Sequence, residues 1–166
     1  LFAYEFEGYW RDVGTLDSLW EANMDLLSPS VPLDLYDPKW KIYSRHENMP
    51  PQYIVSNAHV ENSMITEGSI VDGTVDFSVI SAGVTIEEGA TVKYSIIMPG
   101  TVIKSGAVVE YAIIGEDSVV ESGAKIGMSP ECVENRDDWG IAVVGHNITV
   151  SGKKPVLPKE IISENI

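Results

Sequence analysis

The feature that most constrains the fold of this chain is a row of apolar residues that recur every five or six positions. Neither an α-helix, with its period of 3.6, nor a simple alternating strand produces such a step. The row consists of Ile54, Val60, Ile65, Ile70, Val75, Ile80, Ile86, Val92, Ile97, Ile103, Val109, Ile114, Val120 and Ile126. This spacing predicts a stack of coils built from short strands.

From Ile80 onward the steps group as 6, 6 and 5, so equivalent residues lie 17 positions apart. This predicts triangular coils with three short strands each. Two positions before each apolar residue stands a mostly small one, which strand alternation turns to the same inward side. These are Ser78, Val84, Ala90, Ser95, Thr101, Ala107, Ala112, Ser118 and Ala124. On two of the three sides a glycine usually precedes them by one position, where a sharp corner needs a permissive backbone. These are Gly83, Gly89, Gly100, Gly106 and Gly123.

The rhythm changes at two places along the stack. The early coil from Ile65 to Ile80 is predicted to take three five-residue steps. After Ile126 the pattern breaks, and six-residue steps then resume through Val144, Val150 and Val156. We therefore expect a loop insertion at about residues 127–140 and a last coil after it. Because one coil cannot bury its apolar side alone, neighbouring coils must supply the core.

The first fifty residues have a different character. Residues 1–10 are aromatic and strand-like, and Thr15 begins a helix as its N-cap, with an acid in the first turn and apolar positions that recur to Leu27. Five prolines then mark an extended connector. The predicted organisation is the end of one domain at 1–28, a connector at 29–53 and a coiled β domain at 54–166.

Composition narrows the classes of function. Eleven lysines and arginines against 25 acidic residues give a net charge of −14, which argues against nucleic acid or an anionic membrane as a partner. No apolar run approaches the roughly 20 residues of a membrane helix. Cys132, the single cysteine, allows no internal disulfide and fits a reducing compartment. We expect a soluble, cytoplasmic protein, and a chain that opens on Leu1 is expected to belong to a longer polypeptide.

One side of the predicted coils is distinctly apolar. If Ser78, Ile80 and their equivalents face inward, the residues between them face outward. This outward set is Phe77, Val79, Tyr94, Ile96, Tyr111 and Ile113. We call these six residues the aromatic face. We expect it to dock a catalytic domain or another subunit, although the aromatics could instead cover corners or lie beneath the connector.

These motifs resemble a known family. The repeat is similar to the left-handed parallel β-helix of hexapeptide proteins, and its handedness comes from that resemblance alone. The segments FEGYWRDVGT (6–15), LWEANMDLL (19–27), WKIYS (40–44) and PPQY (50–53) resemble the end of the catalytic domain of bacterial glucose-1-phosphate adenylyltransferases. The implied fold is mainly β, a left-handed parallel β-helix preceded by a strand and helix from an α/β nucleotidyltransferase domain.

The resemblance implies a reaction and partners. The family converts ATP and glucose 1-phosphate into ADP-glucose and pyrophosphate for glycogen synthesis, as a homotetramer or with a related regulatory subunit, and its β-helix serves oligomerisation and allosteric regulation. Most of the active site would lie upstream of this chain, so the fragment alone is expected to be inactive. Asp12 matches the family's aspartate at the Mg²⁺ site, and Mg²⁺ is the cofactor of the full-length enzyme.

The chemistry of Asp12 suits that role. Nucleotidyl transfer builds negative charge on phosphate oxygens, and Mg²⁺ held by one or two carboxylates neutralises it. Asp12 is predicted at a strand-to-helix junction, where α/β domains place ligands. The alternative is an aspartate that only favours the positive end of a helix. For Arg11, a surface ion pair is favoured over a phosphate contact.

Other constellations favour no specific chemistry. His46, His59 and His146 show no metal spacing and are interpreted as surface histidines, and Cys132 as a loop cysteine. Effectors near the domain junction could contact Lys41, Arg45 or Lys104, but no pattern singles them out, so effector residues stay unassigned. Two alternative functions remain: a non-catalytic regulatory subunit of the same system, and a hexapeptide acyltransferase that uses acyl coenzyme A.

Overall fold

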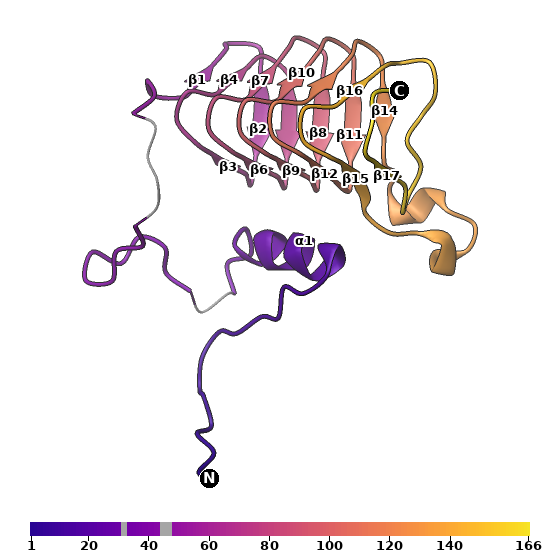
Figure 1. Ribbon diagram of the computed structural model, residues 1–166. Helices are drawn as coiled ribbons and strands as arrows, with labels where there is room; N and C mark the ends of the chain where they lie inside the picture. The colour runs from indigo at the N-terminus through magenta and orange to yellow at the C-terminus, as the bar shows by residue number, and fades with distance from the viewer. Residues whose placement is uncertain (31–32, 44–47) are drawn as a thin grey trace.

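The structure is a computed structural model that describes residues 1–30, 33–43 and 48–166. Its main body is a β-solenoid in which the chain coils around three parallel sheets (Figure 1). One α-helix occurs in these described residues: α1 (Leu16–Asp25) lies beside the solenoid and runs along the stacking direction (Figure 1). Residues 33–43 and 48–52 connect the two parts without regular structure. The predicted stack of three-stranded coils is confirmed.

Successive coils each add a strand to the three sheets, except that the last coil contributes only an isolated bridge to sheet 2. Sheet 1 contains β1 (Tyr53–Ile54), β4 (Ile70–Val71), β7 (Thr85–Ile86), β10 (Val102–Ile103), β13 (Val119–Val120) and β16 (Thr149–Val150). Sheet 2 contains β2 (His59–Glu61), β5 (Thr74–Asp76), β8 (Thr91–Lys93), β11 (Val108–Glu110) and β14 (Lys125–Ile126). Sheet 3 contains β3 (Met64–Ile65), β6 (Val79–Ile80), β9 (Ile96–Ile97), β12 (Ala112–Ile114), β15 (Ala142–Val144) and β17 (Ile161–Ile162).

The strand register confirms the 17-residue period. Val79, Ile96 and Ile113 are successive partners in sheet 3, and Thr85, Val102 and Val119 in sheet 1. The small inward residues predicted from alternation are all buried, as are the large inward isoleucines from Ile80 to Ile126. One continuous apolar core therefore runs the length of the solenoid.

The early coil differs from its predicted spacing. Val71, not Ile70, is the inward residue: Val71 is fully buried, whereas Ile70 is 45% exposed. The coil still has 15 residues, because Ile65 pairs with Ile80, but its steps are six, four and five. The four-residue step contains Gly73, where a Cβ atom would lie 2.4 Å from the Ala90 carbonyl oxygen. Only glycine fits this shortened corner.

The corners of the coils use the left-handed region of φ. The five predicted corner glycines have φ between 69° and 73°. On the third side the corner residues are not glycine: Phe77, Tyr94 and Tyr111 have φ of 44°, 47° and 50°. Each is an αL residue at the turn into sheet 3, so its side chain projects from the corner instead of along a strand. The sequence pattern placed these side chains outward but not in this backbone conformation.

The stack is interrupted once and then closed. Between β14 and β15 the chain leaves the solenoid through two 3-10 turns, η1 (Pro130–Cys132) and η2 (Arg136–Asp138), as expected for the loop at 127–140. The last coil returns with Val144, Val150 and Val156, which are buried, and Val156 bridges to Ile126. The described part of the chain contains no helix long and apolar enough to cross a membrane.

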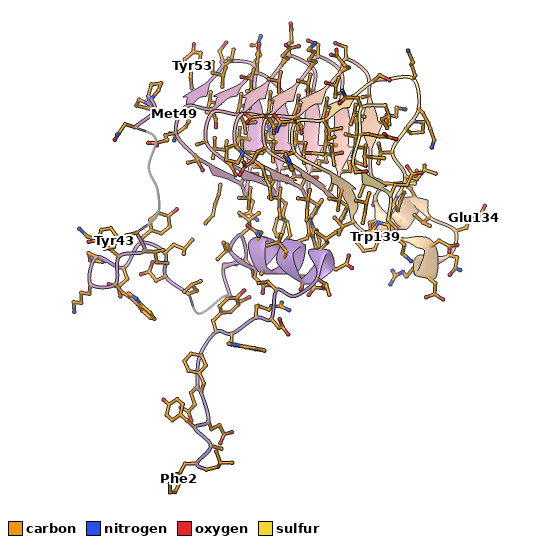
Figure 2. All side chains as sticks on the ribbon, viewed as in Figure 1. Phe2, Tyr43, Met49, Tyr53, Glu134 and Trp139 are labelled. Carbon is orange, nitrogen blue, oxygen red and sulfur yellow. The ribbon has the colours of Figure 1, made fainter. Side chains whose placement is uncertain are left out.

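The strand expected at residues 1–10 is not formed. This segment is extended but carries no ladder, and most of its aromatic side chains are exposed, among them Phe2 (Figure 2), Tyr4 and Trp10. A strand needs a neighbouring strand to pair with its backbone. No strand among the described residues lies against this segment. The predicted strand at 1–10 is therefore wrong for this structure. Among the described residues, α1 is the regular element that precedes the solenoid.

Candidate functional site

Helix α1 begins where the sequence predicts. Thr15 is the N-cap: its hydroxyl accepts from the Ser18 N–H at 3.2 Å, and the Ser18 hydroxyl accepts from the Thr15 N–H at 3.0 Å. This reciprocal capping box satisfies two of the amides that a helix leaves unpaired. The helix then ends at Asp25, two residues before the predicted end. The capped start of α1 directly follows the turn that contains Asp12.

Asp12 lies in this exposed turn. Its Oδ1 accepts a hydrogen bond from the Gly14 N–H at 3.1 Å, so the carboxylate closes a local turn before the helix. Mg²⁺ needs six oxygen ligands, of which proteins usually give one or two carboxylates. No group of three potential metal ligands occurs in the described residues. A single exposed carboxylate does not make a metal centre, and the residues of this chain do not by themselves fit Mg²⁺.

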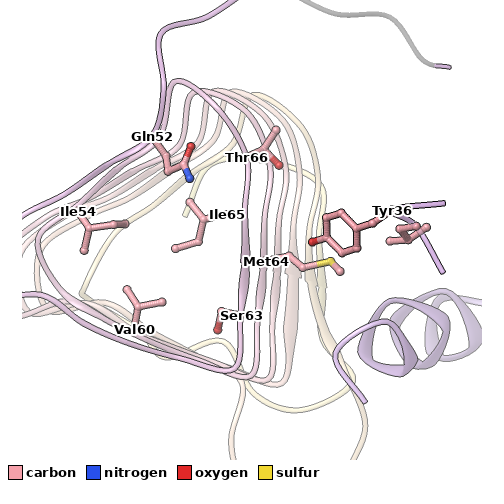
Figure 3. A pocket seen from close by; sticks show the side chains of 9 residues that line it. Tyr36, Gln52, Ile54, Val60, Ser63, Met64, Ile65 and Thr66 are labelled. Carbon is pink, nitrogen blue, oxygen red and sulfur yellow. The ribbon is translucent and has the colours of Figure 1, made fainter. Parts of the chain in front are cut away.

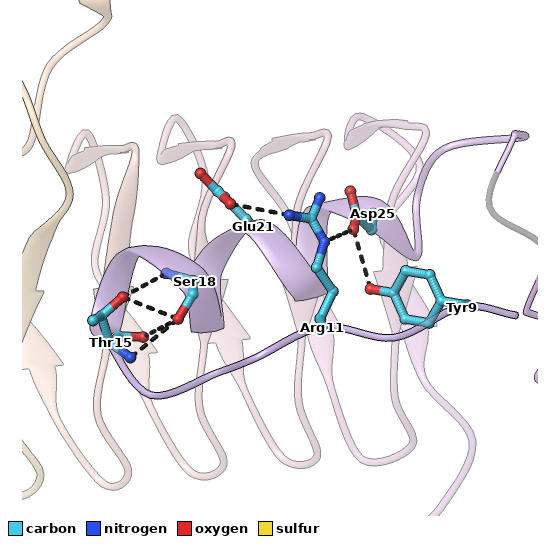
Figure 4. Close-up of polar contacts among 6 residues, drawn as sticks. All are labelled: Tyr9, Arg11, Thr15, Ser18, Glu21 and Asp25. Carbon is cyan, nitrogen blue, oxygen red and sulfur yellow. Dashed lines mark hydrogen bonds and ion pairs between the residues drawn. The ribbon is translucent and has the colours of Figure 1, made fainter. Parts of the chain in front are cut away.

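Arg11 lies against α1, between Glu21 and Asp25 (Figure 4). Its Nε donates to Asp25 Oδ2 at 2.6 Å, and its Nη1 lies 3.3 Å from Glu21 Oε2. The Tyr9 hydroxyl donates to the same Asp25 oxygen at 3.1 Å. The hydrogen bond from Arg11 lowers the pKa of Asp25 below its ordinary value. The surface ion pair favoured from the sequence is the arrangement observed.

The opposite side of α1 packs on the aromatic face. Met24 and Leu27 are buried in one apolar cluster with Ile96, Ile113 and Ile141. The rest of the aromatic face (Phe77, Val79, Tyr94 and Tyr111) is half-buried around them. The structure thus places α1, which lies in the segment predicted as the end of a catalytic domain, on the aromatic face.

Aromatic rings form a column along the corner into sheet 3. Phe77 and Tyr94 lie 5.1 Å apart, and Tyr94 and Tyr111 stack at 4.8 Å with an interplanar angle of 4°. Trp20 of α1 lies 6.0 Å from Tyr111, and Trp139 of the loop insertion meets Tyr111 edge-on at 5.3 Å. Burial raises the pKa of Tyr111 above its ordinary value. Sequence reasoning missed Trp20 and Trp139, since neither belongs to the repeat.

The loop insertion holds its tryptophan firmly in place. Trp139 Nε1 donates to the Met128 carbonyl oxygen at 2.8 Å, which ties the end of the loop to its start. Trp139 lies beside α1 (Figure 2). A cavity of about 430 Å³ is lined there by residues of α1, the loop and the C-terminal segment. The insertion thus extends the contact surface of the helix.

The remaining predicted residues are dispersed. His59 lies on the first coil, 3.6 Å from Glu61, and His146 follows β15 in the last full coil. Cys132 is exposed in η1, and Lys104 pairs with Glu121 at 2.9 Å. Lys41 is exposed in the connector. Arg45 and His46 lie outside the described residues.

A second cavity lies at the open N-terminal end of the solenoid. It has a volume of about 560 Å³ and is lined by the inward residues of the first coil, Ile54, Val60 and Ile65, and by Leu35 and Tyr36 of the connector (Figure 3). Ile54 remains 41% exposed because no coil precedes it within the described residues. This cavity is the unfilled end of the apolar core.

Comparison with known proteins defines the class first. Residues 50–150 match the family model described as GlmU-like, C-terminal hexapeptide, and residues 1–29 match the nucleotidyl transferase family model. Since the hexapeptide model covers more than half of the chain, the protein belongs to this GlmU-like hexapeptide family. The nucleotidyl transferase match covers the segment that contains α1, and the hexapeptide match covers most of the solenoid.

The relatives compared are all glucose-1-phosphate adenylyltransferases. Glucose-1-phosphate adenylyltransferase of Geobacillus stearothermophilus is 58% identical over 89 residues, which is 54% of this chain and 23% of that protein. The same enzyme from Bacillus mycoides strain KBAB4 and from Bacillus cereus strain Q1 is 58% identical over 90 residues, 54% of this chain and 24% of each relative. The matched region thus spans about a quarter of the length of these relatives.

Proposed function

We propose that this chain is the C-terminal part of a glucose-1-phosphate adenylyltransferase. The observation that carries the proposal is the order of the two family matches, a nucleotidyl transferase segment at 1–29 followed by a hexapeptide domain at 50–150, together with 58% identity to enzymes of that name. In the proposed reaction a phosphate oxygen of glucose 1-phosphate attacks the α-phosphorus of ATP. The products are ADP-glucose and pyrophosphate.

Within this proposal the chain supplies one candidate active-site group. Asp12 would be one carboxylate of the Mg²⁺ site, and Mg²⁺ would neutralise charge on the phosphate oxygens. The other ligands and the nucleotide and sugar pockets would come from residues outside this chain. Helix α1 and the capped turn at Thr15 hold the Asp12 carboxylate in place. The 166 residues alone are therefore expected to have no activity.

The solenoid is proposed to assemble and regulate the enzyme in the cytoplasm, as a homotetramer or with a related regulatory subunit. Support comes from the fold, in which the apolar core at the first coil is not closed off. Light scattering on the polypeptide that carries the chain decides the oligomeric state. A monomer at micromolar concentration would contradict this part of the proposal.

The test of the reaction is pyrophosphate release from ATP and glucose 1-phosphate with Mg²⁺. It uses the polypeptide that contains both the nucleotidyltransferase domain and this chain, beside its Asp12→Asn variant. Asp17→Asn is the matched control, since Asp17 lies in the first turn of α1, five residues further on. We expect a loss of at least about 100-fold for Asp12→Asn and little change for Asp17→Asn.

Each other outcome has a definite meaning. Release that is unaffected by Asp12→Asn keeps the enzyme and removes Asp12 from its site. No release by the folded polypeptide with any nucleoside triphosphate favours the regulatory subunit. Titration with acyl coenzyme A tests the acyltransferase alternative.

A further inference from the structure

The corner into sheet 3 contains an unusual hydrogen-bond arrangement. At the Tyr94 corner the Ser95 hydroxyl is inserted between successive coils: it donates to the Lys93 carbonyl oxygen at 2.7 Å and accepts from the Ala112 N–H at 3.1 Å. The backbone N–H of Ala112, in the following coil, therefore donates to a side chain and not to a backbone carbonyl oxygen. The Tyr94 carbonyl oxygen is left available for a donor from outside the solenoid.

The next corner shows what happens without the hydroxyl. Ala112 occupies the position of Ser95 one coil later and has no side-chain acceptor. There the N–H of the following coil, from Ala142, donates directly to the carbonyl oxygen of the αL residue Tyr111 at 3.1 Å. The protein thus contains both arrangements. The two corners differ in the residue that follows the αL residue, which is serine where the corner carbonyl is free of the ladder and alanine where it stays within it.

The freed carbonyl oxygen is used by α1. Trp20 Nε1 donates to it at 2.7 Å, across 74 residues of sequence. The other side-chain hydrogen bonds described for α1 end within residues 9–25. The rest of the contact between α1 and the solenoid is apolar. Apolar packing is not directional. A hydrogen bond has a required geometry, so it can fix the position of the helix along the column.

We propose that Trp20 is a positioning residue, whose hydrogen bond to the Tyr94 carbonyl sets the place of α1 and of the Asp12 turn on the solenoid, and that Ser95 makes this bond possible. The link to catalysis rests on the proposed function of Asp12. The anchoring of α1 on the solenoid does not rest on that function, so the two parts are tested separately.

The anchor is tested by amide hydrogen exchange of α1 in the 166-residue chain. Trp20→Phe keeps most of the ring but removes the donor, and we expect α1 to exchange about three- to tenfold faster. Ser95→Ala should send the Ala112 N–H to the Tyr94 carbonyl, as Ala142 does at Tyr111, and speed exchange similarly. The double variant should exchange no faster than Trp20→Phe, because both changes remove the same bond.

The matched control is Ser63→Ala, two coils earlier. Ser63 makes the same two bonds, donating to the Glu61 carbonyl oxygen at 2.7 Å and accepting from the Ser78 N–H at 3.1 Å. The N–H that it binds belongs to the Phe77–Ser78 peptide unit and not to the unit whose carbonyl Trp20 uses, so exchange in α1 should not change. Unchanged exchange in Trp20→Phe, or additive effects in the double variant, would overturn the anchor.

The positioning role is tested by kinetics of the complete polypeptide. Trp20→Phe should lower kcat several-fold and leave the KM for glucose 1-phosphate unchanged, whereas Trp40→Phe in the exposed part of the connector should change neither. If α1 exchanges faster but kcat is unchanged, the anchor stands and its role in placing Asp12 is wrong. If the wild-type polypeptide has no activity, the proposed function fails, and the positioning of a catalytic Asp12 is overturned with it.

Discussion

At the scale of single residues, the corner into sheet 3 balances strain against contact. An L-residue in the left-handed region costs roughly 1–2 kcal/mol, and Phe77, Tyr94 and Tyr111 all adopt it. Their rings stack on one another and under α1, and aromatic pairs contribute about 0.5–1.5 kcal/mol beyond burial. Glycine at this corner would relieve the strain but would remove the column. Aromatic residues therefore occupy positions where a glycine would fit the backbone better.

The Asp25 carboxylate should make the contact between the N-terminal segment and α1 sensitive to acid. Its pKa is lowered in the folded state, mainly by the hydrogen bond from Arg11. A lowered pKa stabilises the contact at neutral pH, and this stabilisation is lost as the pH falls below about 4, through the folded pKa. NMR of the Arg11 Nε–H should show this transition, and Asp25→Asn should abolish it.

Asp17→Asn is the control for that titration, because Asp17 lies on the same helix but does not contact Arg11 in the described hydrogen bonds. An acid transition of the Arg11 signal that persists in Asp25→Asn would show that another carboxylate governs the contact.

Residue-level prediction from the sequence was accurate where the period was regular and failed where it was not. The inward side chains from Ser78 to Ile126 follow from alternation and the 17-residue repeat. Ile70 was misplaced because the following corner has four residues, and the choice of Val71 depends on the shape of that corner at Gly73. The αL conformation of Tyr94 was also missed, since an aromatic residue gives no signal for positive φ.

At the scale of elements, α1 and the solenoid form two adjacent apolar clusters. Met24 belongs to the cluster beneath the helix, whereas the inward isoleucines form the solenoid core. Met24→Ala should therefore weaken docking by about 2–5 kcal/mol and leave the solenoid folded. Hydrogen exchange should be fast throughout α1 in this variant, while the thermal melting of the sheets followed by circular dichroism stays close to wild type.

Asn23→Ala is the matched control for Met24→Ala. The Asn23 side chain bonds to the Leu19 carbonyl oxygen within α1, so its loss leaves the docked side of the helix intact. A fall in the melting temperature of the sheets in Met24→Ala would show that the two clusters unfold as one unit.

The helix and the N-terminal segment illustrate which elements a sequence can predict. The start of α1 was predicted because Thr15 and the first turn carry a local capping signal. The strand at 1–10 was not formed because pairing depends on a partner strand, which the pattern of one segment cannot supply. The apolar face was visible in the repeat, and a catalytic domain or another subunit was expected on it, but the pattern could not identify α1 as the segment in contact.

At the scale of the whole molecule, stability should depend on position along the stack. A central coil contacts a neighbour on each side, whereas the first coil contacts one. Ile97 is fully buried in the middle, and Ile65 is half-buried at the end. Ile97→Ala should lower the free energy of unfolding by about 2–5 kcal/mol, and Ile65→Ala by clearly less.

Urea denaturation gives the two free energies, and hydrogen exchange shows where each variant opens. Ile65→Ala should speed exchange in β3 and β6 only, and Ile97→Ala throughout the sheets. Equal losses for both variants would mean that the solenoid does not behave as a stack of neighbours.

The lengths of α1 and of the coils beneath it are matched in space. A helix of ten residues is about 15 Å long, and the four rungs β6, β9, β12 and β15 of sheet 3 are separated by three spacings that together measure about 14 Å. Helix α1 therefore spans a fixed number of coils along the stack. Coils added or lost at either end would keep the register and leave the helix seated, whereas a coil inserted between Phe77 and Tyr111 would separate rungs that the helix must reach together. The number of coils can therefore change without unseating the helix only outside the span that α1 covers.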